Sequence, residues 1–152
     1  MTTQRIVPKF NLQLFADGET ATSDFLSENK VTTTLYRGLL AQAVGKTGTI
    51  ERITQMAFGD QGETDDQGKP APPSSEGDLN HTVLTVDIES VDFTADNIVC
   101  FTATVEKGAT DASINEVALI TSGGKTACKM RLASDKGVDA ETSLMFKWSI
   151  EF

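Results

Sequence analysis

The chain has 152 residues, of which 39% are hydrophobic, and a formal net charge of −9 at pH 7. A chain of this length suits one domain, with a core large enough to be stable alone. The acidic balance argues against a nucleic-acid partner, because such affinity rests mainly on Lys and Arg that neutralise phosphates. No apolar run approaches the roughly 18 residues that a membrane span requires, and the N-terminal residues lack the apolar stretch of a signal peptide.

Residues that could bind a metal or cofactor are few. Cys100 and Cys128 fall in predicted strands, where a cysteine usually acts as a small hydrophobe. Nothing in the sequence indicates the oxidising compartment that would favour a disulfide between them. His81 is the only histidine, and the cysteine spacing matches no metal motif. We therefore expect no metal site of this type and no cofactor.

Residues 1–30 carry no sustained period and are predicted to form an extended N-terminal arm. Within this arm, Phe10, Leu12 and Leu14 alternate with polar residues, and Phe15 follows. Two readings are open: an edge strand on the chain's own domain, or an arm that adds a strand to a neighbouring subunit. An exposed apolar strand near a terminus otherwise invites uncontrolled pairing, so we favour the second reading. The candidate partner-docking residues are Phe10, Leu12, Leu14 and Phe15.

One helix is predicted at about residues 33–44. One of three consecutive threonines, residues 32–34, can cap its N-terminus, and Gly45 is a natural stop. Gly38 weakens the helix interior, which suggests that another backbone packs closely there. Apolar residues at helical spacing form a stripe along one side: Leu35, Tyr36, Leu39, Leu40, Ala43 and Val44.

The chain is organised around residues 52–63. The first seven residues predict a strand, but its apolar residues Ile53 and Met56 fall on opposite faces of an ideal strand. Either a strand covered on both faces or a bulge near Gln55 would explain this pattern. An acidic loop at residues 59–80 follows, with four Gly, three Pro and six Asp or Glu. Because few aliphatic residues are available to bury it, we expect the loop to be exposed and partly mobile.

The acidic loop also raises the question of a cation site. Asp60, Glu63, Asp65 and Asp66 carry the oxygen ligands that Ca²⁺ prefers. Their spacing lacks the order of an EF-hand and its bidentate Glu at the twelfth position. We therefore favour a solvated acidic loop and predict no metal site.

From Val83 onward the pattern predicts strand after strand. Residues 84–93 change phase at Glu89 or Ser90, which indicates a bulge, and glycines at 123 and 124 predict a hairpin turn. The last strand is the clearest, with one apolar face: Leu144, Phe146, Trp148, Ile150 and Phe152. We predict a mainly β (α+β) fold, an antiparallel β-sandwich-like domain over residues 31–152 with one packed helix and the arm.

Two groups of motifs suggest a family. Thr33–Val44 is followed by Ile53–Asp60, which reads Ile-Thr-Gln-Met-Ala-Phe-Gly-Asp, and by an acidic, Pro-containing loop. Later, Ile114–Ile120 reads Ile-Asn-Glu-Val-Ala-Leu-Ile before a Gly-Gly-Lys turn. This order resembles the N-terminal domain of phage tail-collar fibre proteins, although Ala118 stands where that family usually has Gly. Such domains usually precede a long fibre, so we expect the docking module without the shaft.

A second resemblance lies in the arm. Residues 11–16 read Asn-Leu-Gln-Leu-Phe-Ala. This segment resembles the opening of many phage structural proteins, particularly head proteins such as capsid and scaffold. It supports a place in the virion and points toward the head.

Together the resemblances imply a non-enzymatic structural protein of a tailed-phage virion, assembled in the host cytoplasm. The first reading is a tail-collar, baseplate or fibre-attachment module that docks to other virion proteins, and the family implies a homotrimer. The alternative is a capsid decoration protein or head-fibre base. A third reading is a glycan-binding receptor module, but Trp148 and Tyr36 fit buried positions better than sugar-stacking ones.

An enzyme is the competing class, and we predict no catalytic residues. Hydrolysis of cell-wall sugars needs two carboxylates facing each other across a cleft. Each available carboxylate lies beside polar residues typical of a solvated face: Glu89, Asp92, Glu116 and Glu141. A catalytic triad would have to use His81, for which the sequence implies no serine or acid partner.

Overall fold

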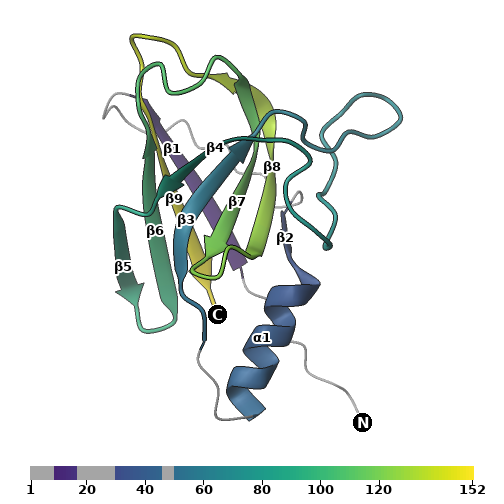
Figure 1. Cartoon of the computed structure of the whole chain (residues 1–152), viewed down its shortest axis with the longest axis vertical. Coiled ribbons are helices and arrows are strands. Elements are labelled where there is room, and N and C mark those ends of the chain that lie inside the picture. Colours follow the sequence, from purple (N-terminus) through teal and green to yellow (C-terminus); the bar gives the residue numbers. More distant parts are fainter. Residues whose placement is uncertain (1–8, 17–29, 46–49) are drawn as a thin grey trace.

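The structure is a computed structural model, which describes residues 9–16, 30–45 and 50–152. These residues form nine strands and one helix (Figure 1). The elements are β1 Lys9–Ala16, β2 Lys30–Thr32, α1 Thr34–Gly45, β3 Ile53–Gly59, β4 Thr82–Asp87, β5 Ser90–Ala95, β6 Ile98–Val105, β7 Ser113–Thr121, β8 Thr126–Gly137 and β9 Leu144–Glu151.

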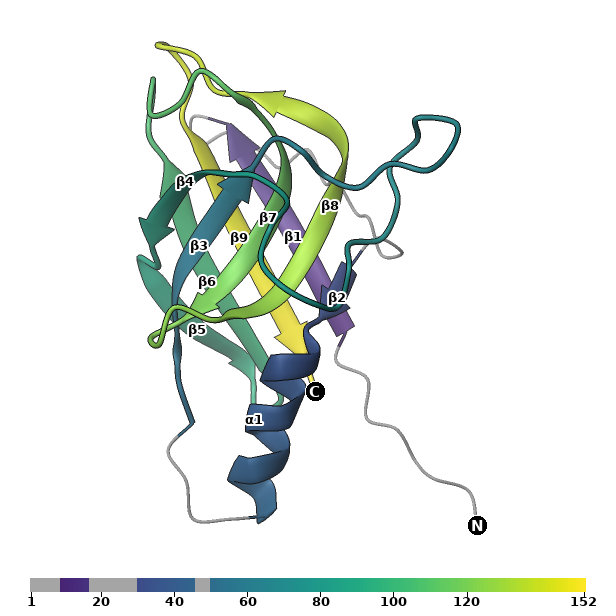
Figure 2. The same cartoon turned by 45° about the vertical axis from the view of Figure 1, so that its right-hand side comes forward.

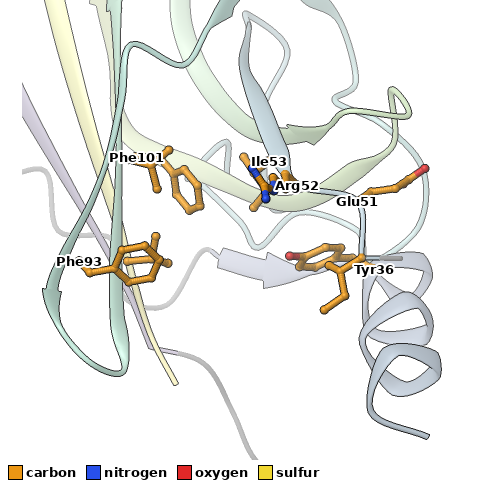
Figure 3. A pocket seen from close by; sticks show the side chains of 9 residues that line it. Tyr36, Glu51, Arg52, Ile53, Phe93 and Phe101 are labelled. Atoms are coloured by element: carbon orange, nitrogen blue, oxygen red, sulfur yellow. The ribbon is translucent and has the colours of Figure 1, made fainter. Parts of the chain in front are cut away.

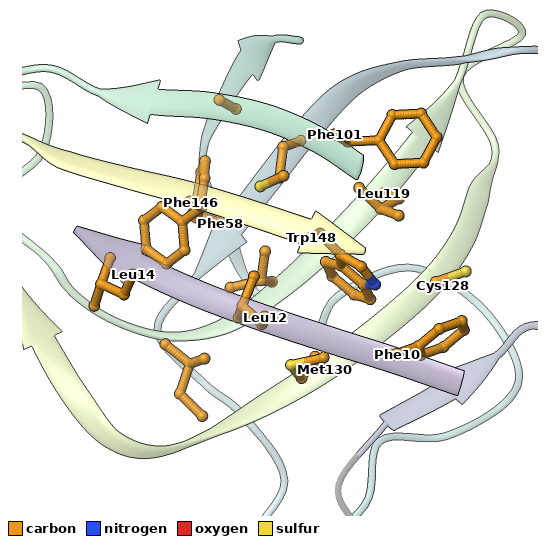
Figure 4. Close-up of a cluster of buried hydrophobic side chains, with 14 of the residues drawn as sticks. Phe10, Leu12, Leu14, Phe58, Phe101, Leu119, Cys128, Met130, Phe146 and Trp148 are labelled. Atoms are coloured by element: carbon orange, nitrogen blue, oxygen red, sulfur yellow. The ribbon is translucent and has the colours of Figure 1, made fainter. Parts of the chain in front are cut away.

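The strands make two antiparallel sheets that pack face to face (Figure 2). One sheet has the order β1-β9-β6-β5 and the other β2-β8-β7-β3-β4. Their facing side chains form one core, in which the rings of Phe58 and Phe146 join the two sheets with centroids 4.7 Å apart (Figure 4). The predicted mainly β, α+β fold is confirmed.

The last strand follows its predicted pattern almost to the end. Leu144, Phe146, Trp148 and Ile150 are buried, and the residues between them are half-buried. Phe152, predicted to lie on the same face, lies beyond β9 and is 53% exposed. The apolar face therefore stops where β9 ends.

The apolar segment of the predicted arm is β1, which pairs along its whole length with β9. Phe10, Leu12 and Leu14 are buried in the chain's own core, and the Phe15 ring lies 5.5 Å from the Lys147 Nζ on the other face. This corrects the favoured reading of a free docking arm. The Phe-x-Leu-x-Leu spacing fits the open edge of β9, which satisfies the β1 backbone within one chain. Residues 1–8 and 17–29 of the arm lie outside the described residues.

The two predicted bulges have different outcomes. The bulge near Gln55 is confirmed, because the β3–β7 register shifts between Ile53 and Gln55. The phase change after β4 is instead a passage between sheets. The Ile88 N–H donates to the Thr54 carbonyl of β3 in one sheet, and the next N–H, that of Glu89, donates to the Thr102 carbonyl of β6 in the other. The side chains change phase because the chain changes sheet.

The helix begins as predicted but is poorly covered. Thr33 caps it, since its Oγ1 accepts a hydrogen bond from the Tyr36 N–H at 3.2 Å, as an N-cap side chain does. Of residues 34–45, Tyr36 alone is buried, and the helix projects beyond one end of the sheets (Figures 1 and 2). Tyr36 lies in the core, and Leu39 and Leu40 pack against it, so the helix is packed on the domain along the middle of its apolar stripe. A Cβ on Gly38 would meet nothing within 4 Å, so the prediction of close backbone packing at Gly38 is wrong.

Candidate functional site

The two motifs behind the family resemblance are adjacent in space. Gly59, near the end of the first motif, is the register partner of Glu116 in the second. The Glu116 carboxylate accepts hydrogen bonds from the backbone N–H of Asn80 at 2.9 Å and of Gln61 and His81 at 3.1 Å each. Glu116 is only 5% exposed, so the prediction that it lies on a solvated face is wrong.

The first motif requires glycine at position 59, because there is no room there for a side chain. A Cβ on Gly59 would lie 2.5 Å from the Glu116 Oε2 and 2.5 Å from the His81 carbonyl oxygen. Any larger residue would therefore displace the carboxylate or the backbone that it binds. Glycine on one strand and glutamate on the next are parts of one arrangement, which we call the Glu116 clamp (Gly59, Gln61, Asn80, His81 and Glu116).

Buried polar residues of β7 and β8 hold the rest of the loop. Asn115 Oδ1 accepts from the Gly62 N–H at 2.8 Å, and Arg131 Nε donates to the Glu63 carbonyl at 3.0 Å. Lys129 Nζ donates to the Glu76 carbonyl at 2.9 Å. Burial lowers the pKa of Lys129, although nearby carboxylates favour its charged form. Most of the loop is exposed, as predicted, including the tip at residues 65–69. Its two ends are anchored by these hydrogen bonds to sheet residues.

The acidic side chains of the loop bond to protein groups. Asp60 Oδ1 lies 2.6 Å from His81 Nδ1, and Asp65 Oδ1 accepts from the backbone N–H groups of Gln67 and Lys69. Across residues 9–16, 30–45 and 50–152, no group of three or more His, Cys, Asp or Glu is placed to hold a metal ion.

His81 does have an acid partner, which the sequence did not imply. The pair with Asp60 lies at the surface, where 55% of the His81 side chain is exposed. Water surrounds such a pair, which has none of the enclosure that strengthens a catalytic base. Glu89, Asp92 and Glu141 are also exposed, as predicted.

The two cysteines are buried and unpaired, one in each sheet. Burial raises the pKa of the Cys128 thiol to about 12, with a smaller opposing effect from Thr32. The reactive form of a cysteine is the thiolate, so Cys128 is a packing residue.

Exposed apolar side chains gather at one end of the molecule. In the described part of the chain, the large apolar residues that are exposed are Leu35, Val44, Ile50, Val91, Phe93 and Phe152. They belong to α1, the segment before β3, strand β5 and the residue after β9. Figures 1 and 2 place these elements at the end of the sheets from which α1 projects. We call this surface the apolar end, and sequence reasoning missed it because it expected the helix to be covered.

A cavity of about 560 Å³ opens within the apolar end, between α1 and β5 (Figure 3). Most of its lining is aliphatic or aromatic, with Glu51 and Arg52 as the charged members: Tyr36, Ile50, Glu51, Arg52, Ile53, Val91, Phe93, Val99 and Phe101. A volume of this size accepts several large side chains or a small ligand. The apolar end is therefore the candidate interaction surface.

No helix in the described residues is long and apolar enough to cross a membrane. No protein-family model matches the sequence, and neither a curated protein nor a solved structure matches it. The function must therefore be inferred from the chain's own residues.

Proposed function

We propose that the chain is a non-enzymatic structural protein of a tailed-phage virion, a tail-collar, baseplate or fibre-attachment module that binds other virion proteins. The supporting observation is the Glu116 clamp. The two short motifs that resemble the tail-collar domain are adjacent strands, with Gly59 opposite Glu116. Two chance matches far apart in the sequence would not be expected to lie side by side in one hydrogen-bonded unit. Their adjacency therefore supports the resemblance.

The proposed work is binding, and the apolar end is the surface for it. Monomeric proteins rarely expose large contiguous apolar patches, and those that do usually bind a partner there. Phe93 is 72% exposed beside a cavity lined by other apolar side chains. Aromatic anchors next to pockets are typical of the residues that dominate protein interfaces. The partners would be other virion proteins and further copies of this chain, for which the family resemblance suggests a trimer.

A capsid decoration protein or head-fibre base is the second candidate. It rests on residues 11–16, which resemble the opening of phage head proteins. In the structure this segment lies in β1, and its Leu12 and Leu14 are buried, so it supports the domain's own core. The glycan-binding reading has less support, because Trp148 and Tyr36 are both buried.

Locating the protein in a particle tests this proposal. A short epitope tag placed at Gln67, on the exposed tip of the loop, would leave the Glu116 clamp intact. We expect gold-labelled antibody to mark the collar or baseplate of purified phage particles, with particles of untagged protein as the control. Label on the capsid would favour the second candidate. Purified particles that contain none of the protein would overturn both.

A further inference from the structure

Strand β1 is held in its sheet by one neighbour. Within the described residues it pairs with β9 alone, and the register runs from Lys9–Glu151 to Ala16–Leu144 without a shift. Residues 17–29 separate β1 along the chain from β2, which lies in the other sheet. No short turn therefore joins β1 to the strand that it pairs with. The place that β1 occupies, which we call the β1 seat, is the edge of β9 and the core beneath it.

The β1 seat requires a particular kind of strand. Phe10, Leu12 and Leu14 are buried in it and belong to one core cluster with Trp148 and Met130 (Figure 4). Without a strand here, the edge of β9 would keep unpaired N–H and C=O groups, and the core beneath it would be open to water. A strand for this seat needs apolar side chains at every second position, so that they share one face. The structure shows that β1 itself is such a strand.

One polar group beneath β1 lacks a hydrogen-bond partner. The ring of Trp148 meets that of Phe10 edge to face, with the two centroids 5.7 Å apart. Among the described residues, Trp148 Nε1 is the one buried side-chain nitrogen or oxygen that makes no hydrogen bond. A buried donor without an acceptor destabilises the packed arrangement, and it can donate to water once the seat opens. Lifting β1 from its seat therefore costs less than its buried apolar area alone implies.

We propose that β1 is exchanged between copies of the chain, so that β1 of one copy occupies the β1 seat of another. The exchanged strand makes the same backbone pairs and core contacts as the strand in its own chain, because the copies are identical. Protein concentration then decides between the closed and the exchanged arrangement. A segment as long as residues 17–29 spans at most about 45 Å when extended, which exceeds the roughly 30 Å width of a small domain. Reciprocal exchange between two copies gives a dimer, and exchange around a ring gives a trimer.

A disulfide across the β1–β9 register tests the exchange in the purified full chain. Gln13 and Lys147 are register partners, and both residues are half-buried. The variant Gln13→Cys/Lys147→Cys, purified in reductant and then oxidised at high concentration, should form linked chains. They should run at two or three times the 16.3 kDa chain mass on a non-reducing gel, whereas a β1 in its own seat gives a disulfide within one chain and a band at the monomer mass. Asn11→Cys/Ser149→Cys is a second pair of register partners and should give the same result.

Gln13→Cys/Glu151→Cys is the matched control. Glu151 follows Lys147 by four positions along β9, about 13 Å along the strand, so its thiol is beyond the reach of a disulfide to position 13. Linked chains should be at least about tenfold fewer in this control than in the register pairs. The control keeps Cys100 and Cys128, so it also measures any linkage through them. A monomer-mass band from both register pairs, or equal linkage in the control, would overturn the exchange.

The inference rests on the proposed function, because it names a second copy of this chain as one partner of the structural protein. The two can nevertheless fail separately. Linked chains of a protein that purified particles lack would overturn the proposed function and leave the exchange standing. A closed monomer found in labelled particles would overturn the exchange and leave the proposed function standing.

Discussion

Glu116 on β7 lies opposite Gly59 on β3, and its carboxylate accepts three backbone hydrogen bonds from the two ends of the acidic loop. Hydrogen bonds to an ionised group are shorter and stronger than neutral ones. A loop that looks unconstrained in the sequence is thereby fastened at both ends to a buried side chain.

Glu116→Gln should lower the free energy of unfolding by about 2–3 kcal/mol. The amide replaces one acceptor oxygen with an N–H₂ group, so at least one loop N–H would face a donor. Chemical denaturation measures the loss. Glu141→Gln makes the same chemical change at an exposed position and should stay within about 0.5 kcal/mol of the wild type. Equal stability of both variants would show that the clamp contributes little.

Gly59→Ala and Gly38→Ala should change stability in opposite directions. At Gly59 the new methyl group would overlap the Glu116 carboxylate and the His81 carbonyl, and such overpacking typically costs about 1–3 kcal/mol. At Gly38 the methyl group would meet nothing, and alanine stabilises an exposed helix interior by about 1 kcal/mol relative to glycine. Melting temperatures that move in the same direction for both variants would contradict the structure.

Strand β1 should be required for stability. Leu12→Ala removes a buried side chain and should cost about 2–5 kcal/mol in chemical denaturation. Asn11→Ala, on the exposed side of the same strand, should cost less than about 0.5 kcal/mol. A chain without residues 1–18 should lose more than Leu12→Ala does, because Phe10, Leu12 and Leu14 leave the core together. A truncated chain that melts like the wild type would restore the reading of a free arm.

The acidic loop should tolerate changes at its tip and not at its ends. Replacing residues 65–69 with a shorter turn should cost less than about 1 kcal/mol, since these residues are exposed and loop length has a small entropic effect. Deleting residues 61–77 should cost several times more. That deletion removes the Gln61 N–H that Glu116 binds and the carbonyl groups that Lys129 and Arg131 bind. Denaturation curves of the two deletions provide the comparison.

The contribution of Cys128 to the free energy of unfolding should fall as the pH rises into the alkaline range. Its pKa is about 12 in the folded chain, against an ordinary value of 9.0. Between these values the unfolded chain loses the thiol proton and the folded chain keeps it. The contribution of Cys128 is therefore complete below pH 9.0 and declines by about 1.4 kcal/mol per pH unit above it. The difference in unfolding free energy between the wild type and Cys128→Ala should shrink across this range, while contributions shared by both proteins, such as that of Lys129, cancel.

Local patterns identified the elements that depend on neighbouring residues. The alternation from Leu144 to Ile150 predicted a strand with one buried face, and Gly124, at a φ of 78°, occupies the turn predicted from the Gly-Gly pair. The cap at Thr33 and the bulge before Gln55 were predictable for the same reason. Caps, turns and alternation act over a few residues, so they can be read along the chain.

Patterns that depend on distant residues were misread. The phase change after β4 predicted a bulge, because a sequence shows that the buried side changes and does not show that the strand has moved to another sheet. The Glu116 carboxylate looked solvated because its donors lie 35 to 55 residues away along the chain. The spacing of apolar residues predicted a stripe along α1. The sequence does not show which element lies opposite that stripe, and so it does not show how much of the stripe is buried.

The sequence by itself determined the fold class, the strand periods, the turns and the helix start, because each follows from backbone preference and from the spacing of apolar residues. Tertiary structure alone decided that β1 completes the core, that the acidic loop is anchored by Glu116, Lys129 and Arg131, and that the apolar end lacks cover. These outcomes depend on contacts between segments far apart in the chain. The sequence shows which apolar and charged side chains need burial or a hydrogen-bond partner. Only the folded chain shows which of them find it among residues of the same chain.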